Sequence, residues 1–129
     1  MRTVADTFAG LRVDTAGVCT GVQISRARYL DELPAMVGGP IEFAHYGTAE
    51  SAITVIVHET GLTDGLPINR LVTVAAAMLR GGPLRYPLHG PIVVLGAAQR
   101  TLDLTDLTES QRTFLLNLPA ALAKVGEAL

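Results

Sequence analysis

The residues of this sequence that could do chemistry lie in two short segments. The first is His58 followed by Glu59, a histidine and a carboxylate at the end of an apolar run. The second is "RGGPLRYPLHG", in which two arginines, a tyrosine and a histidine occur within ten residues. Guanidinium groups beside an aromatic ring can hold a phosphate or stack on a base. We therefore predict that a ligand or partner binds through Arg80, Arg85, Tyr86, His89, His58 and Glu59.

A purely structural role is the alternative for the second segment. Arg80 is expected at the end of a helix, where its charge complements the helix dipole. Tyr86 can pack on the edge of the domain. Both roles remain open, and loop 80–91 is the best candidate in the chain for a surface that binds a ligand or partner.

No coherent catalytic set accompanies these residues. His58 and Glu59 are adjacent in a predicted strand, so their side chains point to opposite faces and cannot act on one substrate atom. The nucleophile motif Gly-x-Ser-x-Gly is absent. Cys19 lies among small apolar residues, where a cysteine is usually an inert core residue. The sequence therefore favours a binding protein over an enzyme.

Metal and cofactor binding are not expected either. If the turn 47–50 closes a hairpin, His45 opposes Ala52, and His58 follows six residues later on that strand. At about 3.3 Å per residue this separates the two histidines by about 20 Å, too far to share an ion. His89 could approach one of them, but a single pair is a poor ligand set. No P-loop or dinucleotide fingerprint is present, so we predict no cofactor.

Composition indicates a soluble, single-domain protein. Of its 129 residues, 49% are hydrophobic and 17% are charged, enough apolar side chains to bury one ordinary core. The net charge of -2 has no basic block, which argues against nucleic acid as a partner. We expect a cytoplasmic protein outside membranes, because the sequence has one cysteine, no apolar leader and no apolar helix of the ~20 residues that span a bilayer. Nine of its ten basic residues are arginine, as in GC-rich genomes of the actinobacterial type.

Turn residues and apolar patterns predict the order ββαββαβ, followed by a C-terminal helical segment. The expected strands are 8–13, 18–24, 41–46, 51–59 and 91–96, and the expected helices follow the N-caps Ser25, Asn69 and Thr108. Strand 91–96 is apolar throughout, as in a strand buried on both faces. We expect an α+β fold with a small, mostly antiparallel sheet and helices on one face.

The chain is expected to form one domain, residues 1–129. Its α+β core spans about residues 8–98, and residues 101–129 form a helical C-terminal extension. Thr108 and Gln111 match a capping box at the start of this extension. Pro34 is expected to kink or split the first helix, and Pro119 leaves either two short helices or one kinked helix at the C-terminus.

The helix after Asn69 is apolar on nearly all sides. Between residues 68 and 79 only Asn69, Arg70 and Thr73 are polar. Such a helix is buried on more than one side, either beneath the C-terminal helix or at a subunit interface. The second alternative makes the protein a homodimer, with interface candidates Leu71, Val74, Ala75 and Met78.

Several motifs resemble a small family of uncharacterised domains found in bacteriophages and mobile elements. They are "GGPIEF", the strand end "HETG", "LPIN" at the start of a helix, and "HGPIVVLG", and together they cover about residues 8–98. The chain departs from the family pattern at His58, where an acidic residue is usual, and at Val72-Thr73, where Ala-Thr is usual. The C-terminal helical segment falls outside the resemblance.

The resemblance implies an accessory role on a phage, plasmid or integrative element, with no activity to transfer. Together with the low charge and the missing catalytic set, it predicts a small non-enzymatic binding module, homodimeric, that engages another protein or a small ligand. The alternative is a binding protein or enzyme for a nucleotide or another phosphorylated ligand, acting through loop 80–91.

Overall fold

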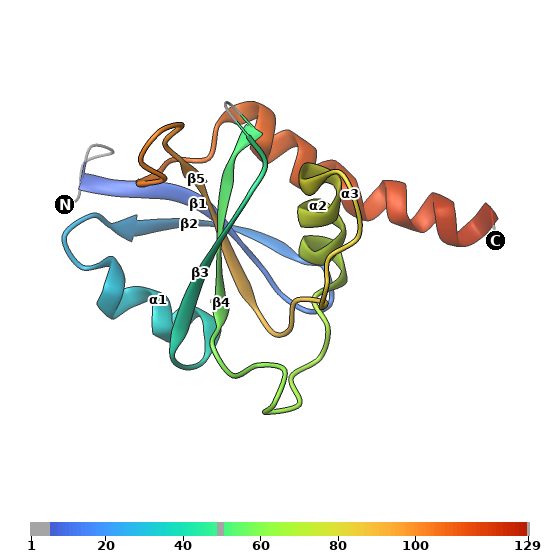
Figure 1. Ribbon diagram of the computed structural model, residues 1–129, viewed down its shortest axis with the longest axis horizontal. Coiled ribbons are helices and arrows are strands. Elements are labelled where there is room, and N and C mark those ends of the chain that lie inside the picture. Colours follow the sequence, from blue (N-terminus) through green and yellow to red (C-terminus); the bar gives the residue numbers. More distant parts are fainter. Residues whose placement is uncertain (1–5, 49–50, 129) are drawn as a thin grey trace.

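The chain folds around one antiparallel sheet (Figure 1). The computed structural model describes residues 6–48 and 51–128, with side chains as far as residue 123. The strands lie in the order β2-β1-β5-β4-β3, and the short β6 pairs with β5. The elements are β1 Thr7–Val13, β2 Cys19–Ser25, α1 Tyr29–Val37, β3 Ile41–Tyr46, β4 Ile53–His58, α2 Arg70–Arg80, β5 Ile92–Ala97, β6 Leu104–Thr105 and α3 Glu109–Ala128. The predicted α+β class and element order are confirmed, with β6 as an addition.

Helices cover both faces of this sheet, so the expectation that they lie on one face is wrong. Helix α1 packs against one face through Leu33 and Val37, while α2 and α3 cover the other (Figure 1). The cause lies in the central strands, because β5 is fully buried from Ile92 to Leu95 and successive side chains of a strand point to opposite faces. A sheet that is apolar on both faces must be covered on both.

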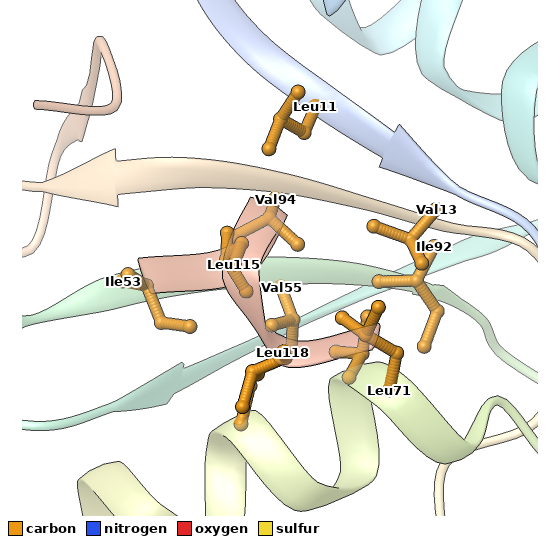
Figure 2. Packing of buried hydrophobic residues seen from close by; sticks show 11 residues of the cluster. Leu11, Val13, Ile53, Val55, Leu71, Ile92, Val94, Leu115 and Leu118 are labelled. Carbon is orange, nitrogen blue, oxygen red and sulfur yellow. The ribbon is translucent and has the colours of Figure 1, made fainter. Parts of the chain in front are cut away.

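Helix α2 packs on the sheet beside α3. Leu71 of α2 meets Leu115 and Leu118 of α3 in one cluster with strand residues such as Val55 and Val94 (Figure 2). Contacts with the sheet and with α3, within one chain, therefore account for the buried side of this apolar helix.

The buried side chain of Asn69 fixes the start of α2. Its Oδ1 accepts a hydrogen bond from the Val72 N–H (3.2 Å), which confirms the predicted N-cap. Its Nδ2 donates to the carbonyl oxygens of Val13 (2.9 Å) and Gly90 (3.0 Å), at the end of β1 and just before β5. The residue is fully buried, and buried amides need such partners. Asn69 thus ties the helix to two strands.

The last helix begins as the sequence predicts. The Thr108 N–H donates to Gln111 Oε1 (3.0 Å), and the Gln111 N–H donates to Thr108 Oγ1 (3.1 Å), the reciprocal pair of a capping box. Gln111 Nε2 also donates to the Ala52 carbonyl oxygen (3.0 Å), which joins α3 to the start of β4. Helix α3 continues through Pro119, so the alternative of two separate helices is excluded.

The first helix starts later than predicted. It begins at Tyr29, after a further turn, and not directly after Ser25. The Ser25 hydroxyl accepts a hydrogen bond from the Arg28 N–H (3.2 Å), and the Ser25 N–H donates to the Glu32 carboxylate (2.9 Å). Ser25 therefore stabilises the turn that precedes the helix. Pro34 lies inside α1 without dividing it.

The β3–β4 hairpin forms, but with a longer turn than predicted. His45 pairs with Thr54 and not with Ala52. A four-residue turn predicts that Tyr46 pairs with Ser51, whereas in the structure Tyr46 pairs with Ile53, two residues later. Thr54 still lies four residues from His58, about 13 Å along the strand, so the two histidines remain at opposite ends of the hairpin.

Candidate functional site

Two of the six candidate residues, Arg80 and Arg85, line one open cleft. The cleft has a volume of about 420 Å³ and lies between the end of α2, the loop after it and the edge strand β3. Strand β3 contributes His45 and Tyr46, and Leu79 forms part of the wall. Because α2 starts beside the end of β1 and runs back across the sheet, its last residues reach the end of β3.

Two arginine side chains bring positive charge to the cleft. Arg80 is the last residue of α2, and its Nη1 donates to the Pro83 carbonyl oxygen (3.2 Å). Arg85 is exposed in the loop that follows. Within the described part of the chain, no carboxylate lies within 4.0 Å of either guanidinium. An anionic group could therefore approach both arginines without displacing an ion pair from these residues.

A protonated phenol lies beside these charges. Tyr46 is half-buried, and burial raises the pKa of its phenol above the ordinary value of 10.0. The Arg80 guanidinium lowers this pKa and the Glu42 carboxylate raises it, but the net direction is upward. The O–H therefore keeps its proton at neutral pH and can donate a hydrogen bond. His45 adds an imidazole whose Nδ1 lies 3.0 Å from the Thr54 hydroxyl.

His58 and Glu59 lie at the opposite end of the β3–β4 hairpin. His58 pairs with Ile41, and its ring packs against Gly39. Its Nδ1 accepts a hydrogen bond from the Thr60 N–H (3.1 Å). The Glu59 side chain is exposed. The structure does not bring this acid–base pair to the cleft, and His58 instead stabilises the loop after β4.

His89 and Tyr86 also lie outside the cleft lining. His89 Nδ1 is 2.7 Å from the Leu66 carbonyl oxygen, so this nitrogen carries the proton and donates. Its Nε2 is buried, with no hydrogen-bond partner among the described residues. The main chain of His89 forms a bridge with Ile68, which places the residue beside the start of α2. Tyr86 is 64% exposed.

The four predicted interface residues divide between core and surface. Leu71 and Ala75 are buried inside the chain, because this side of α2 faces the sheet and α3. Val74 is partly exposed, and Met78 is 57% exposed. A second copy could contact only Val74 and Met78 of this set.

The Cys19 thiol and the possible metal ligands of the described residues form no further reactive site. Burial raises the pKa of the Cys19 thiol above 9.0, and the Asp14 carboxylate raises it further, so the thiol stays protonated at neutral pH. In the described ranges, no group of three or more His, Cys, Asp or Glu side chains is arranged to hold a metal ion. The same residues contain no helix long and apolar enough to cross a membrane.

Sequence reasoning did not identify Tyr46 and Leu79 as cleft residues. Alternation along β3 assigns Tyr46 and Ala44 to one face, and this could have been read from the sequence. The face on which α2 lies, and the point where it ends, depend on packing between distant segments. Only the assembled sheet places Tyr46 beside the last turn of α2.

The fold and the cleft define a small α+β protein with an open, positively charged recess at the edge of its sheet. Over residues 9–118 the chain matches the family described as Domain of unknown function (DUF3846), and it belongs to that family. The match continues past residue 98, where the predicted resemblance ends, and includes the capping box and buried leucines of α3. A search of curated proteins and a search of solved structures found no match.

Proposed function

We propose that the protein is a non-enzymatic binding module whose ligand carries a phosphate or carboxylate group. The observation that supports this best is the cleft of about 420 Å³ that Arg80 and Arg85 share, with no carboxylate partner among the described residues. Small-molecule sites occupy roughly 300–1,000 Å³. The cleft therefore suits a small ligand or the anionic group of a larger one.

Two guanidinium groups are suited to such a ligand. Each presents planar N–H donors that match two oxygen atoms of a phosphate or carboxylate. The Tyr46 phenol adds a neutral donor, because its ordinary pKa of 10.0 already lies above neutral pH and burial raises the pKa further. Both arginines are exposed, so we discount each charge-assisted hydrogen bond for solvent screening to about 1 kcal/mol.

Replacing both arginines is expected to abolish most of the binding. In the double variant Arg80→Gln and Arg85→Gln, the loss of about 2 kcal/mol corresponds to a roughly 30-fold weaker affinity. The wild type is first screened by thermal shift with inorganic phosphate, pyrophosphate, nucleoside 5′-phosphates and succinate. Calorimetric titration with each probe that raises the melting temperature then compares the two proteins.

The control for this experiment is Arg100→Gln, which removes an exposed arginine from the turn before β6. This variant should bind as the wild type does. If no probe stabilises the wild type, or if the double variant binds as tightly as the control, the proposed function is wrong.

Assembly and context are further parts of the proposal. The protein acts as a cytoplasmic homodimer that associates through the exposed side of α2, around Val74 and Met78. Apolar side chains exposed together on a helix are typical of contact surfaces, and Met78 is 57% exposed. The resemblance noted above supports an accessory role on a phage or mobile element.

The dimer is tested by introducing charge at its centre. Light scattering after size-exclusion chromatography should give twice the 13.6 kDa chain mass for the wild type at micromolar concentrations. Met78→Glu should give the monomer mass, because the interface would have to bury a carboxylate. Leu116→Glu, an exposed residue of α3, serves as the control and should remain dimeric. A monomeric wild type removes the dimer from the proposal.

A further inference from the structure

An apolar hollow of about 280 Å³ adjoins the positively charged cleft. It lies between the start of β4, the end of α2 and the first turns of α3. Its apolar lining is Ile53, Leu79, Phe114 and Leu115. Leu79 also lines the cleft, so one side chain forms the boundary between the two recesses.

The two recesses flank a single hairpin turn. Tyr46 of the cleft and Ile53 of the hollow are direct partners across β3 and β4. Thr48 of the cleft is hydrogen-bonded to Ser51 of the hollow, whose hydroxyl donates to the Thr48 carbonyl oxygen (2.7 Å). A ligand that passes Leu79 would therefore reach from one recess into the other.

Three polar residues of the hollow, Ser51, Thr108 and Gln111, make hydrogen bonds within the chain. Gln111 donates to the Ala52 carbonyl oxygen and accepts from the Thr108 N–H, and Thr108 Oγ1 accepts from the Gln111 N–H. The bonds of Thr108 and Gln111 hold the start of α3 in place. The surface that these bonds leave for a ligand is mainly that of the aliphatic and aromatic side chains.

We propose that the ligand is an amphiphile, with its anionic head between Arg80 and Arg85 and an alkyl chain in the hollow lined by Phe114. This inference rests on the proposed function, because it requires the cleft to hold the head group. A carboxylate head and a phosphate head share the chemistry that the arginines recognise. The hollow adds selectivity for the length of the chain, since burial of methylene groups is favourable in proportion to the area removed from water.

The test is a chain-length series. Wild-type protein is titrated with inorganic phosphate and with n-alkyl phosphates of two to ten carbons, each below its micellar concentration, and in parallel with n-alkyl carboxylates of the same lengths. Affinity should rise about fourfold per methylene until the hollow is filled. The series that binds more tightly identifies the head group.

A variant that fills the hollow gives a second readout. Ser110 is an exposed residue of α3 on the hollow's rim, and Ser110→Trp should abolish the chain-length dependence while inorganic phosphate binds unchanged. Asn117→Trp, also exposed on α3 but outside the hollow, should keep the dependence. Circular dichroism confirms that both variants are folded.

The outcomes separate the two proposals. If phosphate binds and affinity is the same at all chain lengths, the amphiphile is excluded and the anion-binding module stands. If the chain-length dependence survives Ser110→Trp, the alkyl group binds elsewhere and the inference fails. If neither phosphate nor any alkyl anion binds the wild type, both proposals fail.

Discussion

The Asn69→Ala variant is expected to have a free energy of unfolding about 3 kcal/mol lower than that of the wild type. The helix cap contributes about 1 kcal/mol. Each of two buried carbonyl groups also loses a donor worth about 1 kcal/mol. Those carbonyls belong to Val13 and Gly90, and the side chain caps the helix by accepting a hydrogen bond from the Val72 N–H. The chain has no tryptophan, so urea unfolding is followed by far-UV circular dichroism. An effect of this size is a large part of the roughly 5–15 kcal/mol that stabilises an ordinary domain.

A carboxylate at the same position separates the two roles of Asn69. Aspartate caps helices as well as asparagine does. However, Asn69→Asp would replace Nδ2 by an oxygen facing the Val13 and Gly90 carbonyls. We therefore expect it to destabilise the protein at least as much as alanine does. Asn117→Ala, on the exposed side of α3, is the control and should change stability by less than about 0.5 kcal/mol. Wild-type stability in Asn69→Asp would show that only the cap matters.

The Gly96→Ala variant is expected to lower the free energy of unfolding by about 2–3 kcal/mol. Gly96 lies in β5, where it pairs with Ile53 of β4 and Thr105 of β6. A methyl group here would lie closer than 3.0 Å to the Asp106 carbonyl oxygen and to the Thr105 hydroxyl. A main-chain oxygen cannot rotate away as a side chain can, so β6 would have to move from β5.

Gly82→Ala is the matched control for this substitution. Gly82 follows α2, its φ is not in the left-handed region, and an added Cβ would meet no atom within 4 Å. Alanine should leave stability within about 0.5 kcal/mol of the wild type or raise it slightly, because the unfolded chain loses freedom. Both variants are compared by urea denaturation. Equal midpoints for Gly96→Ala and Gly82→Ala would show that β6 yields easily, contrary to our account.

Local elements could be predicted from the sequence because their causes are local. The Asn69 cap and the pair formed by Thr108 and Gln111 each depend on residues within three positions of one another. The hairpins followed from turn residues between β-branched runs. The bonds from Asn69 to Val13 and Gly90 could not be predicted, because they depend on which strand ends meet in the assembled sheet.

The distribution of helices over both faces was within reach of the sequence. The segment 91–96 is apolar throughout, as in a strand buried on both sides, and such a strand needs cover on both faces. The register of the β3–β4 hairpin was not within reach in the same way. Residues of a turn can remain unpaired without a compositional mark, so the pairing of His45 with Thr54 required the structure.

The candidate site was predicted only in part, for the same reason. Arg80 and Arg85 are close in sequence and share the cleft. Chemical type alone predicts that His58, Glu59 and His89 join them, but these residues lie in the loop after β4 and in the segment before β5. Tyr46 joins the arginines across more than thirty residues of chain, a proximity that arises from the packing of α2 on the sheet.

The most direct measurement of the central claim is the backbone amide spectrum of ¹⁵N-labelled protein, titrated with inorganic phosphate and with n-octyl phosphate. We expect the shift changes to concentrate in residues 45–48 and 79–85, around the cleft. Octyl phosphate should add changes at Ile53 and Phe114 in the hollow. Changes confined to the loop 58–66 and His89, or spread evenly over the surface, would contradict the assignment of the anion site to Arg80 and Arg85.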